Sequence, residues 1–398
     1  EEKRREKKRR VVRAGVSGRS TTSDVVDAGL EGQYGGRYVF LEHHESHAAS
    51  AFFASPFQDA AILTLDGVGE WATASYGVGH GNRIALTHEL RVPHSLGLLY
   101  SAFTYFTGFK VNSGEYKLMG LAPYGEPRFA GAIFENMIDL KPDGSFRLNM
   151  DCFGFLKGSK MTNRRFEQVL GGPPRDPESS FEQRHMDVAA SVQEVVSEAM
   201  LRLAKQAREV TGEHRLCLAG GVALNCVANG RLQREGPFER IWVQPAAGDA
   251  GSALGVALFI AHQLLDQPRP RRSGDSGEAL DIQQGSLLGD HFTDRAIEEF
   301  LRSTDASYRR FDSEELLVDE IAMLIDEGSV IGWFQGRMEF GPRALGARRI
   351  LGCPSAPGIA DRINAQIKFR ERWRPFCPSV LDRIAKDIIQ TDHPEPFM

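Results

Sequence analysis

Histidine and aspartate residues in the first two thirds of the chain have the types and spacing of a metal site. His43, His44 and His47 lie within five residues, and on a helix His43 and His47 would stack on one face at a metal-chelating distance. Asp66 and Asp249 each stand in a glycine-rich turn that follows an apolar run. Two imidazoles and two carboxylates suit Fe(II), Mn(II) or Zn(II) and leave coordination positions open. The alternative is that the histidines only cap or decorate a surface helix.

A pair of glycines and a lysine could bind an anion. Gly220 and Gly221 follow an apolar run and precede a helical pattern, so their backbone N–H groups could cradle a phosphate. Lys117 lies in a segment, 113–125, that is broken by glycine and proline and is therefore typical of a ligand-facing loop. Ordinary turn chemistry and a solvated lysine are the alternatives for these two features.

Two basic clusters stand near the end of the chain, at residues 335–349 and 364–375. Glycine and proline interrupt their arginines, so a regular charged helix face is not expected, and the forked guanidinium donors suit phosphate groups. Phe369 and Trp373 lie among the basic residues, which would also permit RNA binding. A solvated charged surface is the third interpretation.

The elements that would position these residues repeat the order strand, glycine turn, helix. This order is typical of an α/β fold, in which ligands bind at the carboxyl ends of the strands. Apolar runs and helical periodicity predict strands at 60–65, 215–219, 241–244 and 330–334, and helices at 186–211, 294–301 and 313–326. The segment 267–288 is rich in residues that break regular structure, and we expect it to link a first domain, 1–266, to a second, 289–398.

The composition is that of a globular protein, with 398 residues, 41% hydrophobic and 25% charged. The formal net charge of −5 argues against a general nucleic-acid binder, and no apolar run approaches the roughly 18 residues of a membrane span. The run Glu1–Arg13 carries eight Lys and Arg against three Glu, and we expect a solvated terminus there. Five cysteines without a paired spacing indicate no disulfide framework and favour a cytoplasmic location.

Five motifs occur in an order that is highly specific. They are Glu42-His-His-Glu-Ser-His-Ala-Ala-Ser-Ala-Phe, Leu65-Asp-Gly-Val-Gly-Glu, Gly114-Glu-Tyr-Lys-Leu-Met-Gly-Leu-Ala-Pro-Tyr-Gly, Ala219-Gly-Gly-Val-Ala-Leu-Asn and Phe340-Gly-Pro-Arg-Ala-Leu-Gly. With them, the sequence from about Val39 to its end resembles the O-carbamoyltransferases of the NodU/CmcH family. The resemblance implies an α/β chain with an actin-like ATPase (ASKHA, RNase H-like) domain followed by an α+β YrdC-like domain.

The resemblance also implies a reaction and its ligands. In that family the YrdC-like domain makes carbamoyl-adenylate from ATP and carbamoyl phosphate. The ASKHA domain passes the carbamoyl group to a hydroxyl of a small acceptor of the sugar, aminoglycoside, antibiotic or Nod-factor type. The implied metal, usually iron(II), would be held by His43, His47, Asp66 and Asp249.

Nucleotide and phosphate ligands, with ATP and Mg²⁺ as cofactor, are implied at further positions. The adenylate would meet Gly220, Gly221 and Asn225, with Lys117 near its phosphate. ATP and carbamoyl phosphate would meet Arg337, Arg343, Arg348, Lys368 and Arg370. For the base that accepts the hydroxyl proton, the resemblance implies a histidine near the N-terminus of the family proteins, and His44 is the weaker local candidate.

The sequence departs from the family pattern at both ends. No glycine-rich phosphate turn precedes Val39, and the segment that ends at Met398 resembles the middle of the YrdC-like domain. Cys377 and Arg349 stand where the family often has alanine and serine. We therefore expect a truncated chain, for which an inactive remnant is one alternative and a tRNA-modifying or RNA-binding protein is another.

Overall fold

The computed structural model describes residues 29–32, 39–156, 158, 160–270, 272–274 and 279–389. The chain divides into two units, Glu1–Glu42 and His43–Met398, and the sheet with its covering helices belongs to the second unit. Two expectations concern residues outside the described ones. They are the solvated terminus at Glu1–Arg13 and the resemblance of the segment His393–Met398 to the middle of a YrdC-like domain.

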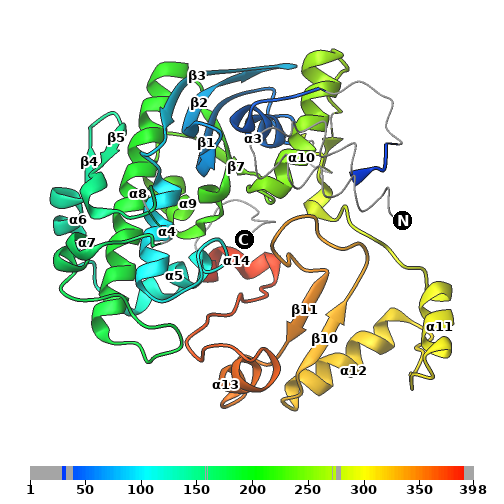
Figure 1. Cartoon of the computed structure of the whole chain (residues 1–398). Helices are drawn as coiled ribbons and strands as arrows, with labels where there is room; N and C mark the ends of the chain where they lie inside the picture. The colour runs from blue at the N-terminus through cyan, green and yellow to red at the C-terminus, as the bar shows by residue number, and fades with distance from the viewer. Residues whose placement is uncertain are drawn as a thin grey trace. The chain divides into compact units, whose positions relative to one another are not determined.

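A five-stranded mixed sheet forms the centre of the second unit, with the strand order β3-β2-β1-β6-β7 (Figure 1). Its strands are β1 (Asp59–Gly69), β2 (Ala72–His80), β3 (Arg83–Arg91), β6 (Arg215–Ala219) and β7 (Arg240–Val243). The first three form an antiparallel meander, whereas β6 and β7 run parallel to β1. Residues 60–65 of β1 are all buried, as an unbroken apolar run in an inner strand predicts.

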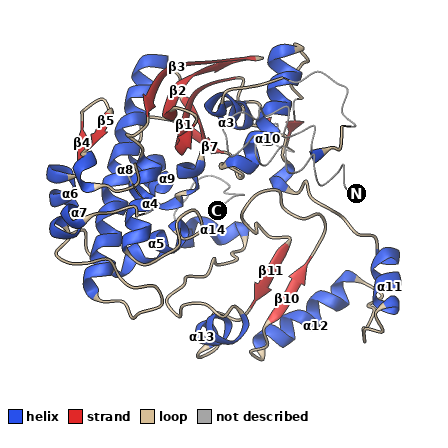
Figure 2. Ribbon diagram, in the orientation of Figure 1, coloured by secondary structure: helices blue, strands red, loops and turns tan. Residues whose placement is uncertain are grey.

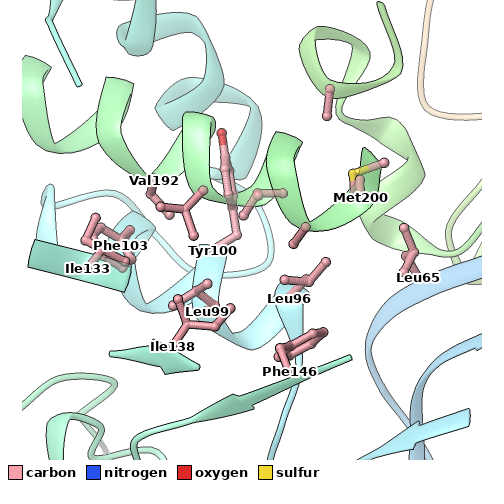
Figure 3. Close-up of a cluster of buried hydrophobic side chains, with 14 of the residues drawn as sticks. Leu65, Leu96, Leu99, Tyr100, Phe103, Ile133, Ile138, Phe146, Val192 and Met200 are labelled. Atoms are coloured by element: carbon pink, nitrogen blue, oxygen red, sulfur yellow. The ribbon is translucent and has the colours of Figure 1, made fainter. Parts of the chain in front are cut away.

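Helices cover both faces of this sheet, because its inner strands are apolar on both sides. Leu63 and Leu65 of β1 belong to a large core with α4 (Leu96–Phe106) and α8 (Gln183–Thr211), part of which is drawn in Figure 3. Ile62, which points to the opposite face, belongs to a second core that includes α3 (His43–Phe52). The sheet is therefore the middle layer of three. His43, His44 and His47 lie on the face that α3 covers.

The remaining elements lie outside these layers (Figure 2). In the first part of the unit they are α5 (Glu115–Leu121), α6 (Ala130–Asn136), β4 (Ile138–Leu140), β5 (Phe146–Leu148), α7 (Arg164–Val169), α9 (Cys226–Glu235) and α10 (Asp249–Leu258). Further along the chain they are β8 (Arg272–Ser273), β9 (Ala279–Leu280), α11 (Asp294–Ser303), α12 (Glu314–Asp326), β10 (Ile331–Phe334), β11 (Arg348–Leu351), α13 (Ile359–Arg362) and α14 (Asp382–Ile389). Within the part of the chain that the structure describes, no helix is long and apolar enough to cross a membrane.

The sequence-based elements are confirmed with small shifts that have local causes. α8 begins three residues before the predicted helix because Glu182 and His185 form a capping box at its start. The expectation that a helix follows directly after Gly220 and Gly221 needs a correction. Gly221 opens a 3₁₀ turn, Gly221–Leu224, instead of an α-helix. α9 starts only after Asn225, whose side-chain oxygen accepts the backbone N–H of Ala228.

The segment expected to be a linker is anchored by Arg269 to the end of α3. Arg269 is only 9% exposed, and its Nη2 donates to the backbone oxygens of Phe52, Phe53 and Ser55 over 2.7, 3.4 and 3.2 Å. These carbonyls lie at the C-terminal end of α3, where a cation also interacts favourably with the helix dipole. The division into two domains at this segment stays a prediction.

Candidate metal centre and basic clusters

Four side chains from three elements bring metal-ligating atoms together. His43 and His47 come from α3, Asp66 from β1 and Asp249 from α10, and one ligand atom of each lies within 4.8 Å of all the others. The two Nε2 atoms are 3.0 Å apart, and Oδ2 of Asp66 lies 2.8 Å from that of His43 and 3.1 Å from that of His47. Oδ1 of Asp249 lies 3.5 and 3.8 Å from the same two nitrogens. We call these four residues the four-ligand cluster.

Local structure explains why these residues converge. The i and i+4 spacing places both imidazoles on one face of α3. The pairing of β1 with β2 is interrupted between Leu65 and Gly69, so Asp66 stands where the ladder opens. α10 approaches α3 closely because Gly255 has no side chain: a Cβ there would overlap the backbone oxygen of Ser46. The cluster thus forms beside the carboxyl end of β1, as an α/β sheet predicts.

Burial and charge differ across the cluster. The side-chain exposure is 0% for His47, 13% for Asp66, 25% for His43 and 81% for Asp249. Burial alone would raise the pKa of Asp66, but its hydrogen bonds with both histidines hold that pKa well below the usual range. The same hydrogen bond raises the pKa of His43, against the effect of burial. Asp66 is therefore a carboxylate across the physiological pH range.

The donor set fits a transition-metal ion. With metal–ligand bonds of about 2.1 Å, neighbouring ligand atoms stand about 3.0 Å apart in an octahedral centre and about 3.4 Å apart in a tetrahedral one. Five of the separations in the cluster, 2.8 to 3.8 Å, span these values, and all four ligand atoms lie within 4.8 Å of one another. Imidazole and carboxylate ligands suit Fe(II), Mn(II) and Zn(II).

The glycine pair lies next to the cluster, and its N–H groups have partners inside the protein. Gly220, with φ at +88°, donates to the backbone oxygen of Ala247 over 2.8 Å. Gly221 donates to Oδ1 of Asp66 over 3.2 Å. Asn225 exchanges hydrogen bonds with the side chain of Gln193 in addition to capping α9. An adenylate at this turn stays a prediction, and it would have to share these groups.

His44 points away from the four-ligand cluster into the sheet. Its Nδ1 lies 2.8 Å from Oγ1 of Thr64 and 3.0 Å from Oγ of Ser75, and the residue is 4% exposed. Burial lowers the pKa of His44 to about 4, so its imidazole is neutral at pH 7. Its Nε2 is buried with no hydrogen-bond partner among the described residues. A role as general base stays a prediction, and Nε2 is the atom that would serve.

Lys117 has a partner from the second basic cluster, which sequence reasoning missed. Its Nζ lies 2.7 Å from Oε1 of Glu371, 254 positions away along the chain. Tyr124, from the same motif as Lys117, donates its hydroxyl to the backbone oxygen of Trp373 over 2.8 Å. The segment 113–125 is therefore in contact with the basic segment 364–375, and Lys117 does not act alone as a free cation.

A buried glutamate organises the first basic cluster. The side chain of Glu339 is fully buried, and its Oε1 accepts backbone N–H groups of Leu345 and Ala347 over 2.8 and 2.6 Å. Its Oε2 accepts Nε of Arg348 over 2.9 Å. Arg348 therefore pairs with a carboxylate of the protein itself. This carboxylate, Glu339, accepts the hydrogen bonds that a bound anion could otherwise accept in this loop.

Arg343 from the same loop reaches toward the glycine turn. Its Nη2 lies 3.5 Å from the backbone oxygen of Leu224. It also lines a cavity of about 70 Å³ whose walls come from the glycine turn, β7 and the basic loop. The lining residues are Met119, Ala223, Leu224, Cys226, Val243, Gln244, Pro245, Arg343 and Leu345.

The other predicted phosphate ligands lie apart in the basic clusters. Arg337 donates to the backbone oxygen of Leu288 over 3.4 Å. Arg370 donates through Nε to Oδ1 of Asn364 over 2.6 Å, within the second cluster. Burial, followed by the charge of Arg370, lowers the pKa of Lys368. The structure gives each cluster its own internal hydrogen bonds, and the binding of phosphate to either stays a prediction.

Comparison with known proteins identifies the family of the chain. Residues 26–258 match the family described as Carbamoyltransferase N-terminus, and residues 322–398 match Carbamoyltransferase C-terminus. A solved structure, that of HypF from T. kodakarensis, has a TM-score of 0.34 and 14% identity over 62% of this chain and 39% of that one, which is too low to bear on the fold.

Several curated relatives align with most of this chain. An uncharacterized protein of Synechocystis sp. is 54% identical over 362 residues, which are 90% of this chain and 58% of that protein. Nodulation protein NolNO of Sinorhizobium fredii is 40% identical over 89% of this chain and 49% of its own length. Nodulation protein NolO of Bradyrhizobium diazoefficiens is 39% identical over 88% and 60%. The chain thus spans about half to three fifths of the length of these relatives, and by its matches to both family regions it belongs to the carbamoyltransferase family.

Proposed function

We propose that this chain takes part in ATP-dependent O-carbamoyl transfer. A carbamoyl group would move from carbamoyl phosphate, through carbamoyl-adenylate, to a hydroxyl of a small metabolite of the sugar, aminoglycoside, antibiotic or Nod-factor type. Family membership supports the transfer of a carbamoyl group. The observation that carries the proposal is the four-ligand cluster beside the carboxyl end of β1, at the edge of the glycine turn.

The cluster and its surroundings would serve the transfer step. His43, His47, Asp66 and Asp249 would hold Fe(II), or Mn(II) or Zn(II) in its place. Such an ion, when bound, supplies a Lewis acid that polarises a carbonyl or phosphate oxygen. The exposed side of the cluster, at Asp249, is where a substrate oxygen would approach.

Transfer itself needs a leaving group and a base. The acceptor oxygen would attack the carbamoyl carbon, the bond from that carbon to the adenylate oxygen would break, and AMP would leave. The hydroxyl proton would pass to a base; His44 is the local candidate, and its buried Nε2 would have to come within reach of the acceptor. Lys117, held by Glu371, would approach the phosphate of the adenylate.

Formation of the adenylate would fall to the later part of the chain, with ATP and Mg²⁺. We propose that this part belongs to a YrdC-like domain and that the mixed sheet belongs to an ASKHA-type domain. Arg337, Arg343, Arg348, Lys368 and Arg370 supply the cationic groups that triphosphate and carbamoyl phosphate require. Glu339 and Asn364, which bond Arg348 and Arg370, would hold these guanidinium groups in orientation.

Two half-reactions test the proposal separately. Labelled carbamoyl phosphate with ATP, Mg²⁺ and Fe(II) should give carbamoyl-adenylate, both with this chain and with a full-length protein that contains it. His47→Ala should abolish metal retention and transfer from supplied adenylate but spare adenylate formation. Arg343→Ala should weaken adenylate formation by about 10- to 100-fold, the value of one charge-assisted phosphate contact. Absence of labelled adenylate from the full-length protein would contradict the proposal.

A further inference from the structure

The nitrogen of His47 that faces away from the four-ligand cluster also has a partner. Nδ1 of His47 lies 3.1 Å from Oγ of Ser252, which belongs to α10. His47 is completely buried, whereas Ser252 is half-buried, so the contact lies at the edge of the protein interior. Ser252 is not one of the four ligating residues of the cluster.

The position of Ser252 follows from the face that α10 presents to α3. Asp249, Ser252 and Gly255 are spaced three residues apart and therefore follow one side of the helix. Asp249 contributes a ligand atom to the cluster, and Gly255 lies against the backbone of Ser46. Ser252, between them, is held opposite the ring of His47 by packing on either side.

The proton on the imidazole gives this contact a chemical meaning. A neutral imidazole has one N–H group, and a nitrogen that ligates a metal must present its lone pair. If Nε2 of His47 faces the ion, the proton is on Nδ1 and is donated to Oγ of Ser252. A hydroxyl at this place stabilises the tautomer that ligates through Nε2 and fixes the plane of the ring.

Asp66 is held in a corresponding way. Its Oδ2 faces the two histidines, whereas its Oδ1 accepts backbone N–H groups of Gly67 over 2.8 Å and Gly221 over 3.2 Å. The two most buried members of the cluster are therefore each fixed through the atom that does not face the cluster. For Asp66 these donors are backbone groups that no side-chain substitution removes, but for His47 the partner is a side chain.

We propose that Ser252 is a positioning residue of the metal site, which sets the tautomer and the orientation of His47. The inference rests on the metal part of the proposed function. It predicts that loss of the hydroxyl weakens metal binding by about 10- to 100-fold, the effect of removing an outer partner of a ligating histidine.

The test is metal affinity, measured by titrating the purified protein with Zn(II) and, without oxygen, Fe(II). Ser252→Ala should weaken binding, and alanine inside a helix should leave the fold intact. Ser252→Thr, which keeps the hydroxyl, should restore most of the affinity. The matched control is Ser50→Ala, because Ser50 is buried on α3 and donates to the backbone oxygen of His47 over 2.7 Å without contacting its ring. That variant should bind metal like the wild type.

A second measurement reports the proton itself. In the Zn(II)-loaded wild type, the Nδ1–H of His47 should give a slowly exchanging proton signal, and Ser252→Ala should lose it. Wild-type affinity in Ser252→Ala, or an equal loss in Ser50→Ala, would overturn the inference while leaving the proposed function standing. Weaker binding in Ser252→Ala without carbamoyl transfer by any variant would support Ser252 and count against the proposed function. A wild type that binds no metal would overturn both.

Discussion

Gly221 donates its backbone N–H to Oδ1 of Asp66, across 155 positions of the chain. A Cβ at position 221 would lie 3.0 Å from the same oxygen, with no other atom within contact distance. The glycine turn after β6 and the carboxylate of the four-ligand cluster are therefore fitted to each other. A change in one should be measurable in the other.

Gly221→Ala should lower metal affinity about tenfold or more, because the new methyl group displaces the carboxylate of Asp66. The loss of stability should stay below about 2 kcal/mol, since only one side chain has to move. Metal titration and thermal unfolding measure the two effects. Gly131→Ala is the control, because a Cβ at that position on α6 meets nothing within 4 Å. An alanine variant at 221 with wild-type affinity would show that Asp66 does not depend on this turn.

Asp249→Asn should weaken the binding of Fe(II) or Mn(II) strongly while changing stability little. The residue opens α10, but the N-cap is Gly248, so Asp249 does not cap this helix. Loss of a negative charge in the first helical turn costs about 0.3 to 1 kcal/mol. Metal titration beside urea unfolding separates the two effects. Unchanged metal affinity would remove Asp249 from the cluster.

Arg269→Ala should lower the free energy of unfolding by about 2 to 4 kcal/mol, because three buried carbonyl oxygens at the end of α3 would each lose a hydrogen bond, and among the described residues only that of Phe52 keeps a donor, Ser55. Urea unfolding measures this. Arg272→Ala is the control, since Arg272 is exposed and donates to the backbone oxygen of Asp281. That control should stay within about 0.5 kcal/mol of the wild type. Equal stability in both variants would mean that water satisfies the carbonyls.

Glu339→Gln should destabilise the protein in a pH-dependent way. Burial alone would raise the pKa of Glu339, but Arg348 and the backbone N–H groups outweigh it and lower that pKa to about 2. A carboxyl whose pKa is lowered on folding contributes stability above its ordinary pKa, 4.5, and loses it as the pH falls toward about 2. At pH 7 the free energy of unfolding of the wild type should exceed that of the variant by at most about 3 kcal/mol.

Thermal unfolding of the wild type and of Glu339→Gln at pH 7 and pH 3 tests the direction of this pH dependence. The difference in stability between the two proteins should shrink at the lower pH. Glu299→Gln serves as the comparison, because Glu299 is exposed on α11. A difference between wild type and Glu339→Gln that stays constant from pH 7 to pH 3 would mean that shape, and not the charge of Glu339, stabilises the loop.

Part of this site could be predicted from the sequence because local rules determine it. The spacing of His43 and His47 fixes their common face once the segment is helical, and strand ends deliver Asp66 and Asp249 to one edge of the sheet. The same rules give the positions of the strands and of α8. The structure brings the four residues together, and their binding of a metal stays a prediction.

The rest depends on contacts that no local pattern encodes. Lys117 and Glu371 are far apart in the sequence, and a carboxylate inside a basic segment gives no sign of its partner. The role of Glu339 is hidden for the same reason, although a lone acid before a Gly-Pro-Arg loop is a usable signal. Ser252 is one serine in a helix of small residues, and only the packing of α10 on α3 brings it to His47.

The gradient of exposure in the four-ligand cluster, from His47 at 0% to Asp249 at 81%, has a kinetic consequence. An ion held there is shielded by the protein on three sides and open to exchange on one. Loading, removal by a chelator and approach of a substrate oxygen would all use the side of Asp249. A substrate that occupies that side should therefore slow dissociation of the ion. The protein should then lose its metal more slowly in the presence of substrate than in its absence.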